Sequence, residues 1–248
     1  MTAEFAPGLD LGLADLHPVD HTSAELAEAL HDEFELLVRH DSGAGRSHVL
    51  AFDAGAVWVM PGAENLAAFD VVRHLEQGTF RLRQSKHANV AFAQKWLVDR
   101  GCPPEALRLD RLLPADERTR RVEERIHGSG DRYEVRDSFA MEGDDNRAWT
   151  MVVDREAAAL PVRLFVEELL PDRKTYTLRE GAFPDEDAAW EWCLREPGPL
   201  PPAPEDRSPE AERIRASLAR SSAPATPGTG GAVPVAGVVA QPGRGRSL

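Results

Sequence analysis

The last fifth of this 248-residue chain contains no aromatic residue. All sixteen Phe, Trp and Tyr residues lie between Phe5 and Trp192, whereas residues 197–248 include 10 Pro and 7 Gly. Large apolar side chains are needed to offset the entropy that a chain loses on folding, and a Pro- and Gly-rich composition is typical of disordered segments. We therefore predict a globular domain over residues 1–196 and a disordered Pro/Gly/Ala-rich tail over residues 197–248.

Long apolar runs and cysteines are also scarce. No run approaches the roughly 18 apolar residues that a membrane-spanning helix needs. Residues 1–12 lack the basic start and apolar stretch of a signal peptide. The two cysteines, Cys102 and Cys193, belong to no CxxC or Cys/His cluster, so neither a disulfide nor a metal site is indicated. We expect a cytoplasmic protein that contacts no membrane and uses no cofactor.

Acidic residues outnumber basic ones, but unevenly along the chain. Residues 1–78 hold 14 acidic and 3 basic residues, residues 79–125 hold 7 and 11, and residues 126–196 hold 17 and 9. The net charge of -13 disfavours nonspecific binding to nucleic acid, although the basic middle segment could still bind a polyanion. Arg outnumbers Lys 26 to 3, a bias that indicates a GC-rich bacterial genome.

Hydrophobic periodicity predicts an α+β fold with a similar arrangement in both halves of the domain. In residues 22–126 we predict helices over 22–31, 63–77, 86–100 and 115–126 and strands over 34–40, 48–53, 56–60 and 79–83. In residues 127–196 we predict strands over 133–141, 147–154, 162–169 and 173–180 and a helix over 185–195. Short turns between the strands indicate antiparallel pairing. We expect two antiparallel β-meanders, each covered by helices, in one compact domain.

The similarity of the two halves has two alternative explanations. Residues 67–71 (AAFDV) and 188–192 (AAWEW) are weakly similar, as an internal duplication would leave them. Five positions of mixed similarity also arise by chance in an Ala-rich sequence. The sequence leaves both explanations open and favours chance.

Three residues are candidates for acid–base catalysis. Asp53 ends a predicted strand, and Asp70 and His74 share one face of the predicted helix 63–77, so a fold that brought them together would form a carboxylate–imidazole group. The sequence contains no GxxxxGK[ST], GxGxxG, GxSxG or HExxH motif, which disfavours nucleotide-dependent and triad-type chemistry. The alternative is that solvent exposure explains Asp70 and the helix dipole explains His74.

A second cluster places two imidazoles and a carboxylate within five residues. His17, Asp20 and His21 have the chemistry of zinc ligands. Pro18 and the missing flanking pattern favour a loop over a helix that would present both imidazoles on one face. We therefore predict no metal site here.

The basic segment 79–125 raises the question of nucleic-acid binding. Residues 86–113 predict a helix, a Gly-containing turn and a second helical segment, with Arg108, Arg111 and Arg118 as candidate phosphate ligands. The first helix is more apolar than a helix-turn-helix motif needs, and the turn contains two prolines. Pairing of the basic segment with acidic parts of the same domain or of another subunit is the favoured alternative.

The leading functional hypothesis is a noncatalytic cytoplasmic bacterial regulatory or adaptor protein that binds a protein partner or a second copy of itself. In the tail, residues 209–220 predict a short amphipathic helix, and residues 232–240 resemble a docking motif or ordinary low-complexity sequence. The alternatives are a cofactor-independent hydrolase that uses Asp53, Asp70 and His74 and a DNA-binding regulator that uses the basic segment. Whether the protein is an enzyme stays open.

Overall fold

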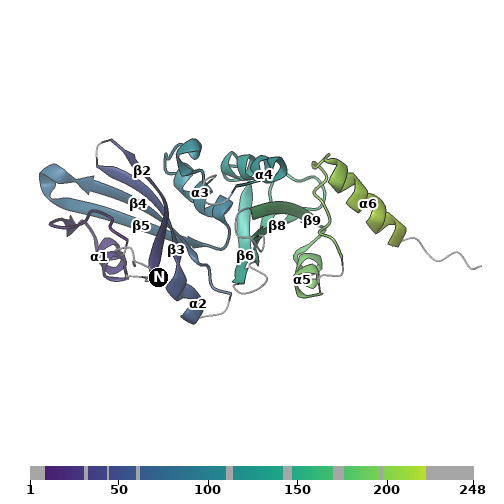
Figure 1. Cartoon of the computed structure of the whole chain (residues 1–248), viewed down its shortest axis with the longest axis horizontal. Helices are drawn as coiled ribbons and strands as arrows, with labels where there is room; N and C mark the ends of the chain where they lie inside the picture. The colour runs from purple at the N-terminus through teal and green to yellow at the C-terminus, as the bar shows by residue number, and fades with distance from the viewer. Residues whose placement is uncertain are drawn as a thin grey trace, which may run out of the picture.

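Two antiparallel sheets lie along the long axis of the molecule, with helices between and around them (Figure 1). The computed structural model describes residues 9–30, 33–43, 45–59, 62–109, 114–141, 147–169, 176–195 and 198–221. The predicted α+β fold, with two antiparallel meanders and helices in one compact domain, is confirmed. Within these residues, no helix combines the length and the apolar character needed to cross a membrane.

The first sheet has five strands in the order β1-β5-β4-β3-β2. Its strands are β1 (His17–Pro18), β2 (Phe34–Ser42), β3 (Arg46–Asp53), β4 (Leu66–His74) and β5 (Thr79–His87). β1 pairs in parallel with β5, and the other neighbours are antiparallel. The short connection between β4 and β5 contains the 3-10 helix η1 (Leu75–Gln77) and ends at Gly78, whose φ of 60° lies in the left-handed region that favours glycine.

Different elements cover the two faces of this sheet. Helix α1 (His21–Glu28) and the segment that precedes it pack on one face, where Val49 and Phe69 belong to the buried cluster. Helix α3 (Val90–Val98) packs on the other face, against Leu50 and Ala68. The 3-10 helix η2 (Pro104–Leu107) follows α3 on that face. Alternation of side chains along β3 and β4 produces these two cores.

The second sheet has four strands in the order β6-β7-β8-β9. They are β6 (Tyr133–Met141), β7 (Arg147–Asp154), β8 (Val162–Leu169) and β9 (Tyr176–Phe183), and all pairs are antiparallel. Helix α4 (Glu117–His127) packs on one face and helix α5 (Glu186–Arg195) on the other. Helix α3 joins the two sheets, because Phe92 packs against Phe165 of the second sheet while Ala93 and Leu97 pack on the first.

The two halves share an order of elements, a helix, four strands and a helix, and the first half has the additional helix α2 (Ala54–Val59) between its second and third strands. We call α1 to α3 unit one and α4 to α5 unit two. In each unit the register of the first strand pair shifts after its third residue, between Leu36 and Val38 in β2 and between Val135 and Asp137 in β6. A shared irregularity at the same position is difficult to explain by the general rules of meander packing.

A buried hydrogen bond is also repeated. Ser23 Oγ in α1 accepts a 3.1 Å bond from the backbone N–H of Leu82, and Thr119 Oγ1 in α4 accepts a 3.1 Å bond from the N–H of Leu178. The same sequence spacing separates Ser23 from Thr119 and Leu82 from Leu178. This is the pattern that an internal duplication leaves. The similarity between residues 67–71 and 188–192 is no part of it, because the first set lies in strand β4 and the second in helix α5.

Two predicted elements of unit one are wrong. Residues 63–77, predicted as a helix, form strand β4, whose run of apolar residues is buried on both faces and therefore lacks the alternation of a half-exposed strand. Residues 56–60, predicted as a strand, overlap helix α2 (Ala54–Val59). The side chain of Asp53 begins this helix by accepting hydrogen bonds of 3.1 Å from the N–H groups of Gly55 and Ala56.

The boundary of the predicted tail is also wrong. Residues 198–206 pack on unit two, where Pro202 bridges to Gly181 of the edge strand β9 and Ala203 is buried, and the start of the following helix contacts α4 through Glu210 and Arg118. Helix α6 (Pro209–Ser221) confirms the predicted amphipathic helix 209–220. Aromatic residues are not required here, since small side chains pack on a sheet that other residues have already formed. Residues 222–248, including the stretch 232–240, lie outside the described residues.

Candidate functional site

The three candidate catalytic residues do not converge. Asp70 is in register with His48 of β3, and Asp53 lies an odd number of residues from His48 on the same strand. Side chains alternate along a strand, so Asp53 and Asp70 are on opposite faces of the sheet. His74 ends β4, about 13 Å along the strand from Asp70. These residues therefore do not form the carboxylate–imidazole group that a hydrolase would need.

Asp53 has a structural role that unit two repeats. It caps α2 and forms an ion pair with Lys86. At the equivalent end of β7, Asp154 accepts a 3.1 Å hydrogen bond from the N–H of Glu156 and pairs with Arg132 at 2.7 Å. A buried carboxylate thus closes the turn after the second strand of each meander.

The candidate metal ligands have local partners as well. Asp20 caps α1 by accepting a 2.8 Å hydrogen bond from the N–H of Ser23. His21, in the first turn of α1, lies 3.1 Å from Glu25, and His17 is exposed in β1. Across the described part of the chain, no group of three His, Cys, Asp or Glu residues is arranged to hold a metal ion.

The two candidate phosphate ligands that the structure describes, Arg108 and Arg118, line different cavities. Arg118 pairs with Asp206 at 2.8 Å and with Glu210 at 2.7 Å, so two acids of the predicted tail neutralise it. Arg108 is exposed after η2, and Arg111 lies outside the described residues. Helix α3 is buried between the two sheets and is followed by η2, so it is not available to enter a DNA groove.

Asp70 instead organises a charged surface on unit one. It is 1% exposed, and Arg46 binds it through two hydrogen bonds of 2.8 and 3.1 Å. Arg83, across from it on β5, approaches to 3.6 Å, and His48 Nε2 lies 3.7 Å away. A bidentate guanidinium–carboxylate pair fixes both orientation and distance. The buried acid therefore holds the arginines in defined positions on the sheet.

Arg100, just beyond the end of α3, adds a third guanidinium that interacts electrostatically with Asp70. It stacks over Trp96 with its central carbon 3.5 Å from the ring centroid and donates a 2.9 Å hydrogen bond to the carbonyl of Trp96. Burial lowers the pKa of His48, and the nearby charge of Arg46 lowers it further, so the imidazole is neutral near pH 7. We call Arg46, His48, Asp70, Arg83 and Arg100 the Asp70 surface.

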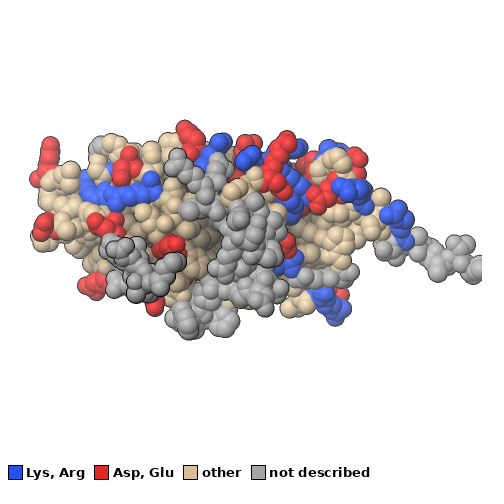
Figure 2. Space-filling view, viewed as in Figure 1, with Lys and Arg blue, Asp and Glu red and all other residues tan. Residues whose placement is uncertain are grey.

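The charges of the Asp70 surface are accessible although its centre is not. The side chain of Arg46 is 34% exposed and that of Arg83 is 51% exposed. Figure 2 shows a strip of Lys and Arg side chains over unit one, with Asp and Glu side chains beside it, on a molecule whose overall charge is negative. Three guanidinium groups near one carboxylate leave this surface locally positive, and it can bind carboxylate or phosphate groups.

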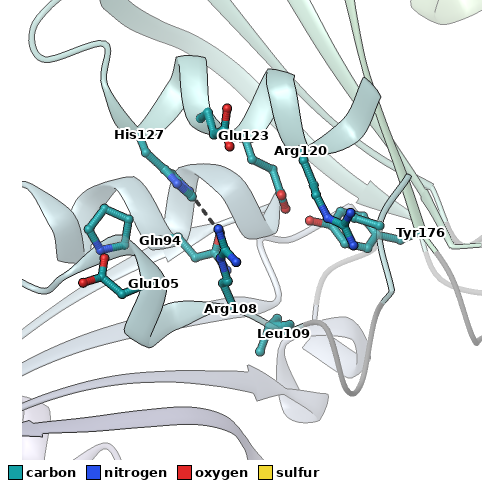
Figure 3. A pocket seen from close by; sticks show the side chains of 11 residues that line it. Gln94, Glu105, Arg108, Leu109, Arg120, Glu123, His127 and Tyr176 are labelled. Carbon is teal, nitrogen blue, oxygen red and sulfur yellow. Dashed lines mark hydrogen bonds between the residues drawn. The ribbon is translucent and has the colours of Figure 1, made fainter. Parts of the chain in front are cut away.

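A groove lies between the two units, lined by α3, η2, α4 and β9 (Figure 3). His127 Nε2 and Gln94 Oε1 are 3.0 Å apart, and Gln94 Nε2 donates a 2.7 Å hydrogen bond to the carbonyl of Leu107. Burial lowers the pKa of His127 to about 4, with a smaller contribution from Lys95, so the neutral ring donates to Gln94.

The groove is too small for most substrates. Its volume is about 140 Å³, compared with roughly 300 to 1,000 Å³ for typical ligand pockets. Figure 3 shows Arg108 and Arg120 in it together with Glu105 and Glu123, so its charges are mixed. The hydrogen-bonded pair of Gln94 and His127 joins α3 to α4, and we interpret the groove as part of the junction between the units.

A buried carboxylate belongs to the same junction. Glu167 of β8 accepts a 3.0 Å hydrogen bond from the N–H of Val90, at the start of α3. Burial raises the pKa of Glu167 to about 8. This residue thus satisfies a helix terminus of unit one from the sheet of unit two, and its perturbed pKa follows from that position.

The sequence alone does not identify Arg46, Arg83 and Arg100 as a group. They are distant in sequence, and they meet only because β3, β4 and β5 pair in one register. Residues 66–72 carried no alternation that would have signalled a strand, and their apolar run was predicted as part of a helix over residues 63–77. No protein-family model, curated protein or solved structure matches the chain, so no relative indicates which site is functional.

Proposed function

We propose that the protein acts by noncovalent association, as a regulatory or adaptor protein that binds a protein partner. The Asp70 surface is the observation that supports this most. It presents guanidinium groups that are partly exposed and held in place by a buried acid. Preorganised charges of this kind favour specific association, because little entropy is lost when the partner binds.

A catalytic role has less support from the geometry. Asp53, Asp70 and His74 lie on different faces or ends of the sheet, and Asp53 and Asp70 are each held in ion pairs. The groove between the units is small, and its histidine is bonded to Gln94. A hydrolase needs a base, a reacting group and a substrate-sized cavity at one place.

A protein partner fits this surface better than a nucleic acid. DNA-binding proteins commonly make about 6 to 10 phosphate contacts, whereas the Asp70 surface offers three arginines around an acid. The chain also carries a net charge of -13, which repels a long polyanion. A short acidic segment of a protein matches the size and the sign of this surface.

Affinity purification tests the proposal. The tagged full chain is compared with Arg83→Glu and with the matched control Arg155→Glu, whose side chain is 57% exposed in unit two. We expect lysate of the source organism to yield a protein that the wild type and Arg155→Glu retain and that Arg83→Glu loses. Recovery of the same proteins by all three baits, or of none, would contradict the proposal.

A further inference from the structure

Unit two contains a second cavity, between the edge of its sheet and the residues that follow α5. Its volume is about 290 Å³, about twice that of the groove between the units. It is thus close to the roughly 300 Å³ at which typical ligand pockets begin. Strands β7, β8 and β9, helices α4, α5 and α6 and residues 198–200 all contribute to its lining. We call it the Trp192 cavity.

The apolar part of this lining belongs to one hydrophobic cluster. Val166 of β8 and Trp192 of α5 are buried in it, and Leu200 packs against them. Ile214 of α6 adds a further apolar side chain to the cavity. The indole N–H of Trp192 donates a 3.3 Å hydrogen bond to the carbonyl of Gly198, which holds residues 198–200 beside α5. An apolar group that enters the cavity therefore leaves water for a preformed apolar surface.

Three arginines of the lining supply positive charge. Arg118 of α4, Arg147 of β7 and Arg179 of β9 are distant in sequence, and their side chains are only 16%, 19% and 22% exposed. The central carbon of the Arg147 guanidinium lies 5.5 Å from the centroid of the Trp192 ring. Arg179 donates a 3.0 Å hydrogen bond to Thr119 Oγ1. These contacts hold the guanidinium groups in place beside the apolar lining.

Each of these arginines pairs with a carboxylate that is about half exposed. The pairs are Arg147 with Glu168 at 2.8 Å, Arg179 with Asp116 at 2.6 Å and Arg118 with Glu210 at 2.7 Å. The side chains of the three acids are 44%, 47% and 50% exposed, respectively. The arginines are therefore the buried members of these pairs, and the acids are the members that solvent reaches.

The carboxylate of a ligand can replace such an acid at little cost. The displaced side chain returns to water, and ion pairs of exposed groups contribute little to stability. The arginine exchanges one carboxylate for another, while the apolar part of the ligand gains contacts that the acid did not make. Glu168 is the acid best placed for this exchange, because the arginine that it binds is the one beside Trp192.

We propose that the Trp192 cavity binds a small molecule with one carboxylate and an apolar body. The carboxylate binds the guanidinium of Arg147 in place of Glu168, and the apolar body lies against Trp192 and Leu200. This inference goes beyond the proposed association with a protein partner. The cavity is in unit two and shares no residue with the Asp70 surface.

The charges of the lining favour a carboxylate over a phosphate group. The three arginines are matched by three acids, Glu168, Glu180 and Glu210. Glu180 is buried and pairs with Arg125 and Arg163, so it stays in place. Displacement of Glu168 alone leaves one net positive charge, which a single carboxylate neutralises and a doubly charged phosphate exceeds.

Phenylacetate and hexanoate are suitable probes of the Trp192 cavity, and isothermal titration calorimetry of the full chain measures their binding. Phenylacetamide has the shape of phenylacetate without its charge, and acetate has the charge without the apolar body. We expect both probes to bind with a Kd of about 1 mM or lower. Phenylacetamide and acetate should bind at least about tenfold more weakly.

Substitutions of the two members of one ion pair should have opposite effects. Arg147→Gln removes the group that binds the ligand and should weaken phenylacetate binding about tenfold. Glu168→Gln removes the competing carboxylate and should strengthen binding by about threefold or more. The matched control is Arg155→Gln, whose side chain is 57% exposed in unit two and which should leave the Kd within about twofold.

Several outcomes would overturn the inference. Binding of neither probe, or equal binding of phenylacetate and phenylacetamide, excludes the proposed ligand class. An unchanged Kd for Glu168→Gln excludes the exchange of carboxylates, and this half-exposed replacement keeps the test valid if Arg147→Gln does not fold. Loss of binding in Arg83→Glu would place the ligand on the Asp70 surface instead. Circular dichroism confirms the fold of each variant, and the Arg83-dependent purification tests the proposed function separately.

Discussion

Units one and two share a backbone plan and differ in what they do with one face of the sheet. Both have a helix whose hydroxyl accepts a hydrogen bond from the sheet, through Ser23 and Thr119, and both have a register shift in the first strand. At the position of Asp70, however, unit two has Val166. In unit two Leu200 packs on this face beneath α5, and unit one leaves Arg46 and Arg83 partly exposed.

This difference shows which features two units with one backbone plan have in common. Buried backbone groups need partners in every copy, so the hydroxyl–amide bond and the acid at the turn persist. Surface side chains carry no such constraint and can diverge. The comparison therefore assigns a structural role to the shared polar residues, and those that differ are the candidates for the proposed association.

Residues 198–221 should give the largest effect on stability. Truncation after Glu196 removes Leu200 and Ala203 from their packing on unit two and takes Glu205 from Arg163, which keeps Asp154 and Glu180 as partners. The loss of a packed leucine side chain alone costs about 2 to 5 kcal/mol. Urea denaturation should show a loss of at least that size. Truncation after Ser221 is the control and should leave the free energy of unfolding unchanged. Equal stability of both truncated chains would show that residues 198–221 do not cover unit two.

Asp70→Val gives unit one the residue that unit two has at the equivalent position. Arg46 and Arg83 lose their shared carboxylate, and because both are partly exposed we expect a loss of about 2 to 3 kcal/mol in the free energy of unfolding. Urea denaturation measures the change. The matched control is Val166→Ile, a small apolar change at the equivalent site. An Asp70→Val protein as stable as the wild type would mean that Asp70 does not organise the arginines.

A change of pH should affect the units differently at the end of their last strands. His87 of β5 stands where β9 has Phe183, and burial, with a smaller contribution from Arg100, lowers the pKa of His87 to about 4. Between pH 6.5 and about 4 the unfolded chain binds a proton that the folded chain does not bind. Stability should therefore decrease as the pH falls through this range.

His87→Phe should remove about 1 to 3 kcal/mol of that decrease. The measurement is urea denaturation at about pH 7 and at about pH 4.5. Most of the expected pH-dependent change in the free energy of unfolding falls between these two values. The control is His74→Phe, which makes the same chemical change at an exposed side chain. Identical pH dependence of His87→Phe and the wild type would mean that His87 is not buried in the neutral form.

The repeated hydroxyl–amide bond should give a smaller and similar effect in each unit. Ser23→Ala and Thr119→Val each leave a buried backbone N–H without its acceptor, at Leu82 and Leu178 respectively, which costs about 1 to 2 kcal/mol. Denaturation of the two variants measures both costs. A large loss for one variant and none for the other would mean that the two bonds are not structurally equivalent.

Much of the second half of the fold was predictable because its strands are separated by clear turns. The strands over residues 133–141, 147–154 and 162–169 match β6, β7 and β8 in the structure. The helix over residues 115–126 also matches α4, since its charges and apolar positions follow a helical period. Local pattern was sufficient where one face of an element is exposed.

The Asp70 surface was not predictable, because its central strand is buried on both faces. Leu66 to Val72 are nearly all buried, so the strand around Asp70 shows no alternation, and its apolar residues also fit a helix. The residue types of Asp70 and His74 suggested acid–base catalysis. Only strand pairing shows that Arg46 and Arg83 are the neighbours of Asp70. Register between distant strands is a property of the whole sheet and leaves little trace in a local window.

The sequence by itself determined the α+β class, the meander of the second half, the negative overall charge and the amphipathic helix at residues 209–220. Local periodicity, turn chemistry and composition decide these features, because each depends on neighbours in sequence. The tertiary structure alone decided where folding continues past Trp192, which residues surround Asp70, and that two units share one plan. Those features depend on contacts between segments that are distant in sequence. The Pro-rich, aromatic-free stretch after Trp192, for example, packs on a surface that other residues form.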